Sequence, residues 1–188
     1  MGNRIIICAV YGTWNHGKDH CDPDRRRDSQ DEGRNRNVDM DVEVDYEVRV
    51  PAGVEFNGTV VSGDIRAEGL QSDVSVTTVD GEIFVSTSGR AWAKTVAGDI
   101  EIEMGSLGNE DMDFNTVSGD ITLWLPADLA ADVDFNSLTG DFDSDFDLDI
   151  RRQRDRFIGL EIEGTIGGGG RDLSFNTVSG DVSLRRRG

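Results

Sequence analysis

A glycine followed by an acidic residue recurs along most of this chain at nearly constant spacing. The pairs begin at positions 63, 81, 98, 119, 140 and 180, so the successive intervals are 18, 17, 21, 21 and 40 residues. The last interval predicts one degenerate unit between Asp141 and Gly180. Near copies of one motif surround the pairs, as in Val117–Ile121 and Val178–Val182. Self-similarity at a fixed period indicates a protein built from stacked repeats.

Apolar and polar residues alternate on both sides of each glycine–acid pair. Val74 and Val76 precede Gly81, and Ile83 and Val85 follow it. An alternation of period two places one face of a strand toward the core. Each unit is therefore predicted to be a strand, a Gly–acid turn, a second strand and a second turn. Glycine suits the turn because it adopts backbone conformations that other residues resist.

The repeat predicts an all-β, single-domain β-solenoid, similar to a parallel β-helix, with stacked two-strand units of about 20 residues. An antiparallel β-sandwich is the alternative, because its turns also recur at short intervals. Within the single domain 1–188 we expect a first strand in 1–14, a polar loop over 15–39, repeat coils over 40–184 and a basic tail at 185–188. Alternation from Asp39 to Val50 predicts a strand there.

The segments between and before the turns carry a family resemblance. They are Tyr46–Gly53, the repeated Thr-Val-Ser-Gly-Asp turns and the run Gly164–Gly170. With these segments the chain resembles a bacterial β-strand-repeat family of adhesin-type domains, largely of unknown function. The resemblance spans about Val44 to Leu184. It implies a solenoid and export from the cell, and it supplies no catalytic residues.

Charge and motifs narrow the classes of function. The net charge of −18 repels nucleic acid and anionic membranes. No apolar run reaches the ~20 residues of a membrane span, so we expect no membrane insertion. Ile5–Val10 is too short for the core of a signal peptide, which leaves two alternatives: a leader has been removed before this sequence, or the protein is not exported. The chain has no Gly-x-Ser-x-Gly or His-Glu-x-x-His motif, which argues against an enzyme.

The acids of the repeated turns form the candidate metal site. If the coils stack in register, the acids fall along one edge, about 5 Å apart, where carboxylates repel one another. Bound calcium would relieve that repulsion, and the alternative is that each acid caps its own turn. We call this set the acid column: Asp64, Glu82, Asp99, Asp120, Asp141 and Asp181. No other cofactor is expected.

Both cysteines and both histidines of the chain lie close together near its start, as Cys8, His16, His20 and Cys21. In an exported protein Cys8 and Cys21 would form a disulfide that closes the polar loop. Free thiols and a zinc site built from all four residues are the alternatives, although the spacing fits no standard zinc finger.

These features predict a non-enzymatic, exported structural or adhesin-like surface module that is extracellular or attached to the cell surface. Its expected partners are a cell-surface or matrix component or further copies of itself. One alternative is a self-assembling β-solenoid filament subunit, because an open solenoid ends in unpaired strands unless they are capped. The first strand together with the polar loop is one expected cap, and the basic tail is the other. The other alternative is a calcium-dependent module that binds cell wall or matrix through the acid column.

Overall fold

The computed structural model describes residues 44–106, 110–155 and 159–188. The chain divides into two compact units, Met1–Val48 and Arg49–Gly188. Only residues 44–48 of the first unit are described, and they lie in no strand.

All regular structure in the described residues is β-strand, and no described helix is long and apolar enough to cross a membrane. The strands are β1 (Phe56–Thr59), β2 (Ile65–Leu70), β3 (Val74–Thr77), β4 (Ile83–Thr87), β5 (Ala91–Lys94), β6 (Ile100–Met104), β7 (Met112–Asn115), β8 (Ile121–Leu125), β9 (Ala131–Thr139), β10 (Phe142–Ser144), β11 (Leu148–Asp155), β12 (Leu160–Ile166), β13 (Arg171–Ser179) and β14 (Val182–Arg186).

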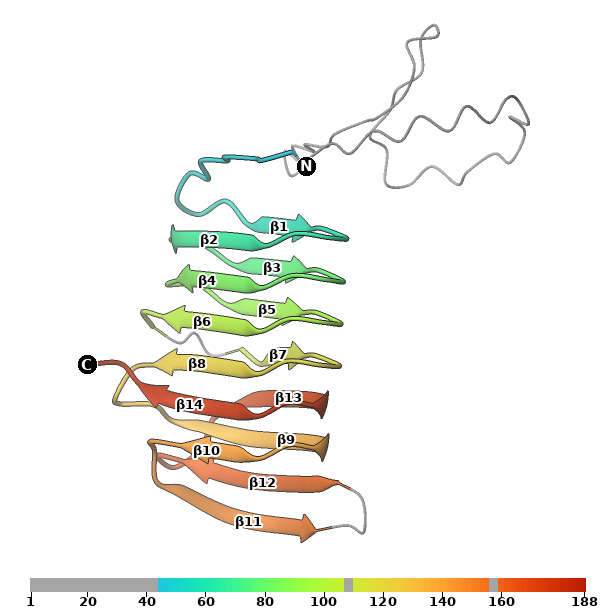
Figure 1. Ribbon diagram of the computed structural model, residues 1–188. Helices are drawn as coiled ribbons and strands as arrows, with labels where there is room; N and C mark the ends of the chain where they lie inside the picture. The colour runs from blue at the N-terminus through green and yellow to red at the C-terminus, as the bar shows by residue number, and fades with distance from the viewer. Residues whose placement is uncertain (1–43, 107–109, 156–158) are drawn as a thin grey trace, which may run out of the picture. The chain divides into compact units, whose positions relative to one another are not determined.

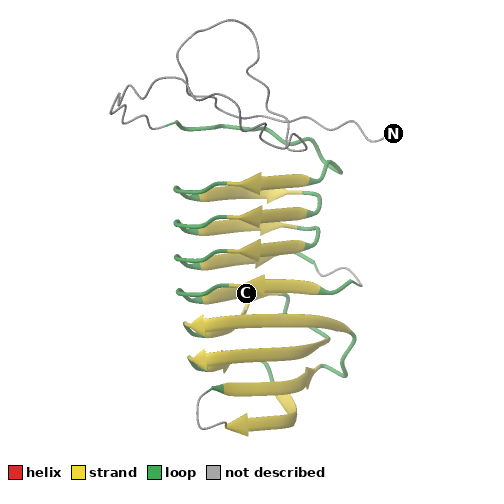
Figure 2. Ribbon diagram, turned by 90° about the vertical axis from the view of Figure 1, so that its right-hand side faces the viewer, coloured by secondary structure: helices red, strands yellow, loops and turns green. Residues whose placement is uncertain are grey.

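The strands form two facing sheets (Figures 1 and 2). The first sheet has the order β1-β3-β5-β7-β13-β9-β12-β11, and the second has the order β10-β14-β8-β6-β4-β2. A Gly–acid turn joins one strand of the first sheet to the next strand of the second sheet, and each such pair is one coil. Neighbouring coils pair in parallel, as Val74 does with Ala91. The predicted β-solenoid is confirmed, and the sandwich alternative is wrong because the coil strands pair in parallel.

The coils do not stack in the order of the sequence. The last coil, β13–β14, lies between coil β7–β8 and coil β9–β10. Phe175 pairs with Phe114 on one side and with Phe135 on the other. The red strands β13 and β14 are therefore in the middle of the stack in Figure 1, above the orange β9 and β10.

The degenerate unit between Asp141 and Gly180 is an antiparallel pair of strands. β12 pairs antiparallel with β9, and β11 pairs antiparallel with β12. Gly167–Gly170, all with positive φ, form the turn that leads from β12 into β13. The pair extends the first sheet beyond coil β9–β10 (Figure 1).

Two expectations about the boundaries are wrong. The described residues 44–50 alternate in polarity but lie in no strand. The basic tail does not cap an end, because Arg185 and Arg186 belong to β14 and pair with Trp124 and Leu125 of β8. The first strand in 1–14 and the polar loop over 15–39 lie outside the described residues.

Aromatic and aliphatic side chains of the alternating strands fill the space between the two sheets. Phe114, Phe135 and Phe175 are fully buried at matching positions of three neighbouring coils. The rings of Phe114 and Phe175 stack with centroids 5.4 Å apart. Phe142 of β10 tilts against Phe135 at 5.4 Å. Burial of these rings is a large part of the hydrophobic stabilisation, because aromatic side chains remove the most area from water.

At five of the six Gly–acid turns, all except that of Gly63 in the end coil, the glycines stack so closely on the neighbouring coil that a Cβ would collide with its backbone. Gly119 has φ of +138°, and a Cβ built on it would lie 2.2 Å from the carbonyl oxygen of Gly98 in the neighbouring coil. A Cβ on Gly180 would lie 2.0 Å from the oxygen of Gly119. The glycine of the repeat is therefore required by its backbone conformation and by the close approach of the coils.

Replacing Gly119 with alanine is expected to destabilise the fold strongly. Gly119→Ala combines an unfavourable φ with a collision against backbone, so we expect a loss of about 3 kcal/mol or more. Gly53→Ala is the control, because Gly53 also has positive φ (+77°) but its Cβ would meet no atom within 4 Å. Urea unfolding followed by circular dichroism measures both. Equal losses would contradict the close-approach argument.

Removing the last coil is expected to disrupt the middle of the stack. A chain ending at Gly170 lacks β13 and β14 and exposes coil β7–β8 and coil β9–β10 together. A chain starting at Asp73 loses coil β1–β2 from one end and breaks a single interface between coils. We expect cooperative thermal unfolding to survive in the second truncation and to be lost in the first. Native-like melting of the chain that ends at Gly170 would contradict the inserted position of the last coil.

Candidate functional site

The acid column lies along the Gly–acid turns, and most of its carboxylates cap the neighbouring coil. The backbone N–H of Glu82 donates to Asp64 Oδ1 at 2.9 Å, and that of Asp120 donates to Asp99 Oδ1 at 2.8 Å. The Asp181 N–H donates to Asp120 Oδ1 at 2.8 Å, and the Asp141 N–H donates to Asp181 Oδ1 at 2.8 Å. The expected register is therefore observed, with Asp181 between Asp120 and Asp141.

These caps run between coils, whereas the sequence suggested a cap within each turn. Each donated hydrogen bond satisfies a backbone amide that the turn geometry leaves without a strand partner. Within the described ranges, no three Asp, Glu, His or Cys side chains are grouped so that they could hold a metal ion. The arrangement supports the capping alternative, and calcium binding by the column stays a prediction.

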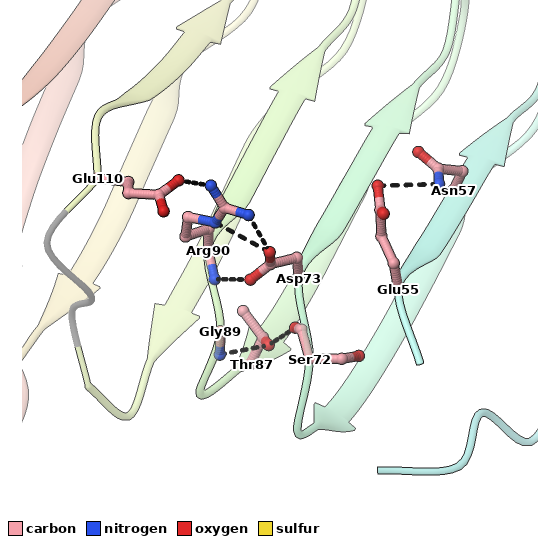
Figure 3. Close-up of polar contacts among 8 residues, drawn as sticks. All are labelled: Glu55, Asn57, Ser72, Asp73, Thr87, Gly89, Arg90 and Glu110. Carbon is pink, nitrogen blue, oxygen red and sulfur yellow. Dashed lines mark hydrogen bonds and ion pairs between the residues drawn. The ribbon is translucent and has the colours of Figure 1, made fainter. Parts of the chain in front are cut away.

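A second polar cluster joins the turns at the opposite ends of the strands (Figure 3). Arg90 donates from its backbone N–H to Asp73 Oδ1 at 3.0 Å and from Nε to Asp73 Oδ2 at 2.9 Å. Its guanidinium also pairs with Glu110 and lies 4.8 Å from the ring centroid of Trp92. The side-chain bond from Arg90 is the main cause that lowers the pKa of Asp73. This cluster links successive coils, and two carboxylates and one aromatic ring contact the Arg90 guanidinium.

An acidic hollow lies on the outer face of the first sheet, and sequence reasoning missed it. Its volume is about 520 Å³. Its lining comes from five strands and the residue before β7: Asp111, Met112, Asp113, Asp132, Val133, Asp134, Arg151, Glu163, Asp172 and Ser174. We call this surface the acidic hollow.

The inserted coil explains how so many acids share one surface. Ser174 pairs with Asp113 on one side and with Asp134 on the other, so a neutral residue separates two carboxylates. Like charges directly opposite each other on a sheet are destabilising. Asp172 pairs with Asp132 without such a spacer, and its backbone N–H donates to Asp111 Oδ1 at 3.0 Å.

Asp132 is the best-bonded acid of the hollow. It accepts from the Gly170 N–H at 3.2 Å, from the Thr165 hydroxyl at 2.9 Å and from Arg151 at 2.6 Å. The Gly170 bond, followed by the Thr165 bond and the Arg151 charge, lowers the pKa of Asp132. Asp132 therefore fastens the β12–β13 turn to β9 and stays ionised.

Asp134, two residues further along β9, has the opposite environment. Partial burial raises the pKa of Asp134, and the charges of Glu163, Glu161 and Asp172 raise it further. Its only bond that favours the ionised form comes from Asn136 Nδ2, at 3.0 Å. The hollow therefore contains one carboxylate that the fold stabilises as an ion and one whose ionisation the fold opposes.

The other candidate residues lie outside the described part of the chain. Cys8 and Cys21 of the expected disulfide, and His16 and His20 of the zinc alternative, all fall in residues 1–43. Arg151 pairs with Asp132 and Arg152 with Glu163, while Asp143 pairs with Arg185 of β14.

A family model described as Toastrack DUF4097 matches residues 41–185. Toastrack is a β-solenoid-like repeat domain of unknown function, in agreement with the fold seen here. The match bears out the β-repeat part of the resemblance noted in the sequence and gives no support to an adhesin name. No curated protein and no solved structure matches the chain.

Neutralising the two β9 acids is expected to change stability in opposite directions. The folded-state pKa of Asp132 is lowered, so its stabilisation is present above the unfolded pKa of about 3.9 and is lost as pH falls through the folded value. Asp132→Asn should therefore lower the melting temperature at pH 7. The folded-state pKa of Asp134 is raised, so stability falls as pH rises from the unfolded toward the folded value. Asp134→Asn should raise the melting temperature at pH 7.

Thermal melts at pH 7 and at pH 3 test this pair, and each variant is the control for the other. Both differences from the parent chain should shrink at pH 3, because below about 3.9 the carboxyl of the unfolded chain is protonated and the pKa difference between the two states contributes less to stability. A decrease of similar size for both variants at pH 7 would contradict the assigned environments.

Proposed function

We propose, from the premise that the chain belongs to the Toastrack DUF4097 family, that it is a non-catalytic, exported module that acts as a structural or adhesive element at the cell surface. Its partner is then a cell-surface or matrix component. The observation that carries this proposal is the continuous bonding between coils.

Two kinds of bond join every coil level to the next: parallel strands pair on both sheets, and the turn backbones bond across coils. At four of the five junctions a carboxylate of the acid column also caps an amide of the neighbouring coil. The hydrogen bonds between turns have normal lengths; the Ser118 N–H, for example, donates to the Val96 oxygen at 2.9 Å. A body tied at every level resists local opening, which suits a load-bearing or displayed element.

The charged side chains that could take part in catalysis form structural hydrogen bonds and ion pairs instead. Asp99 and Asp120 cap backbone amides, Arg90 is held by Asp73 and Glu110, and Asp132 fastens the β12–β13 turn. The acidic hollow is a concave surface of about 520 Å³, and its unbalanced negative charge attracts basic groups at a distance. These features support adhesion to a basic surface more than they support turnover.

Self-assembly is a second candidate, favoured by the strand edges at one end. Within the described ranges, the outer edges of β1 and β2 pair with no other strand. The edge strand β11 at the other end has an irregular register between Ile150 and Arg152 and carries several arginines. Bulges and charges of this kind protect edges from pairing. The outer edge of β10 at that end is also unpaired within the described ranges, but β10 has only three residues, and short edge strands resist pairing. The two ends therefore differ, which favours association through the β1–β2 end over an open-ended filament.

Adhesion is tested with the full chain coupled to fluorescent beads, which are exposed to peptidoglycan sacculi and to surfaces coated with matrix proteins. We expect retention on at least one surface and a decrease of several-fold in retention for a Glu163→Gln/Asp172→Asn variant, because the lost charge weakens attraction to basic groups. An Asp45→Asn/Asp128→Asn variant removes the same charge elsewhere and is the control.

The same preparation is examined for the competing roles. Turnover on a panel of glycans and esters that disappears in a point variant would overturn the non-catalytic proposal. Filaments in electron micrographs, or concentration-dependent association in sedimentation without retention on any surface, would favour self-assembly in place of adhesion.

A further inference from the structure

Six aliphatic side chains form a continuous exposed line along the Gly–acid turns. Each is the residue two positions before the turn glycine, and each is 44–72% exposed. In spatial order the set is Val61, Val79, Val96, Val117, Val178 and Leu138, and we call it the aliphatic column.

The register of the turns fixes this column. The residues that follow its members pair from coil to coil, as Asp80 does with Ala97 and Ala97 does with Ser118. The Ala97 N–H donates to the Val79 oxygen at 2.9 Å, and the Ser118 N–H donates to the Val96 oxygen at 2.9 Å. Six levels at about 4.8 Å give a rigid apolar line roughly 24 Å long.

The turn itself does not require an aliphatic residue at this place. The buried position of the turn belongs to the preceding residue, such as Thr95 or Thr116. Val96 and Val117 point outward and remain about half exposed. Single exposed apolar residues are ordinary, but an ordered row of six along one edge is typical of an interaction surface.

The acid column gives this edge its charge. It belongs to the same turns, with each acid three residues after the aliphatic residue, as Glu82 is after Val79. Within the described ranges no member of the acid column has an ion-pair partner. The edge therefore combines an apolar line with a line of uncompensated carboxylates.

We propose that this edge docks a basic amphipathic helix from another protein. A helix of about 16 residues spans the ~24 Å of the column, and its apolar face repeats every 5.4 Å, close to the spacing of the coils. Lysines or arginines beside that face meet the acid column. A second copy of this chain is disfavoured as the occupant, because it would bring one acid column against another.

The inference stands apart from the adhesive role, because it concerns the turn edge and not the acidic hollow. A loss of adhesion would leave it untouched, and its own failure would leave the adhesion proposal untouched.

The test measures binding of a synthetic 18-residue leucine–lysine amphipathic peptide to the full chain by fluorescence anisotropy. We expect saturable binding that weakens with added salt, together with a gain of peptide helicity in circular dichroism. A leucine–glutamate peptide with the same apolar pattern, and a leucine–lysine peptide of scrambled order, should bind far more weakly.

Three double variants, one of them a control, assign the surface. Val96→Thr/Val117→Thr keeps the β-branched shape but adds hydroxyls, and we expect about a tenfold weaker affinity. Val54→Thr/Ile150→Thr is the matched control, since both residues are similarly exposed (48% and 46%) and lie outside the column. Glu82→Gln/Asp141→Asn neutralises two carboxylates of the acid column that accept none of the backbone hydrogen bonds described above. This variant should reduce the salt dependence of peptide binding.

Any one of four outcomes would overturn the proposal. One is equal affinity of the ordered and scrambled peptides, which would mean charge attraction alone. Another is an unchanged affinity in Val96→Thr/Val117→Thr, or no binding of the peptide at all. The last is a dimer in sedimentation that Val96→Thr/Val117→Thr dissociates, which would assign the edge to a second copy of this chain.

Discussion

The close approach of the turn backbones is the constraint on which the whole structure depends. A Cβ on Gly98 or Gly119 would lie 2.2 Å from the carbonyl oxygen of the glycine in the neighbouring coil. Only with glycine there can the turns pack at the spacing that the parallel strands demand. The same packing lets Asp99 of one coil reach the amide of Asp120 in the next. The glycine and the acid therefore recur as a pair because one permits the approach and the other uses it.

The sequence was sufficient to predict the coil but not the order in which coils stack. Every coil offers the same parallel edges, so alternation and turn spacing fit any order equally well. A stronger signal was nevertheless present: the seven residues from Phe114 to Asp120 are repeated without change from Phe175 to Asp181. These two segments are spatial neighbours, and Phe114 and Phe175 stack at 5.4 Å. Identity between distant segments thus marked direct contact, because identical side chains stack best in register.

The acidic hollow was beyond sequence reasoning for a related reason. Its acids come from strands that become neighbours only through the inserted last coil and the antiparallel β11–β12 pair. The local sequence does not distinguish Asp132 from Asp134. Asp132 accepts hydrogen bonds from three groups, whereas the surroundings of Asp134 oppose its ionisation. The prediction of a strand ending at Val50 was wrong for a similar reason. Alternation shows that a segment is suited to a sheet, but a strand also needs an edge to pair with.

The acid column shows how one residue type meets two demands. One carboxylate oxygen of Asp99, and one of Asp120, accepts a hydrogen bond from a backbone amide of the adjacent coil. This structural role needs no partner molecule. The negative charge remains, and among the described residues no cation offsets it. A chain with a net charge of −18 gains nothing in folding from adding repulsion along one edge. The turn amides need only an acceptor, which asparagine also supplies. The repeated choice of acids beside an exposed aliphatic line is therefore better explained by a basic partner than by the needs of the turn.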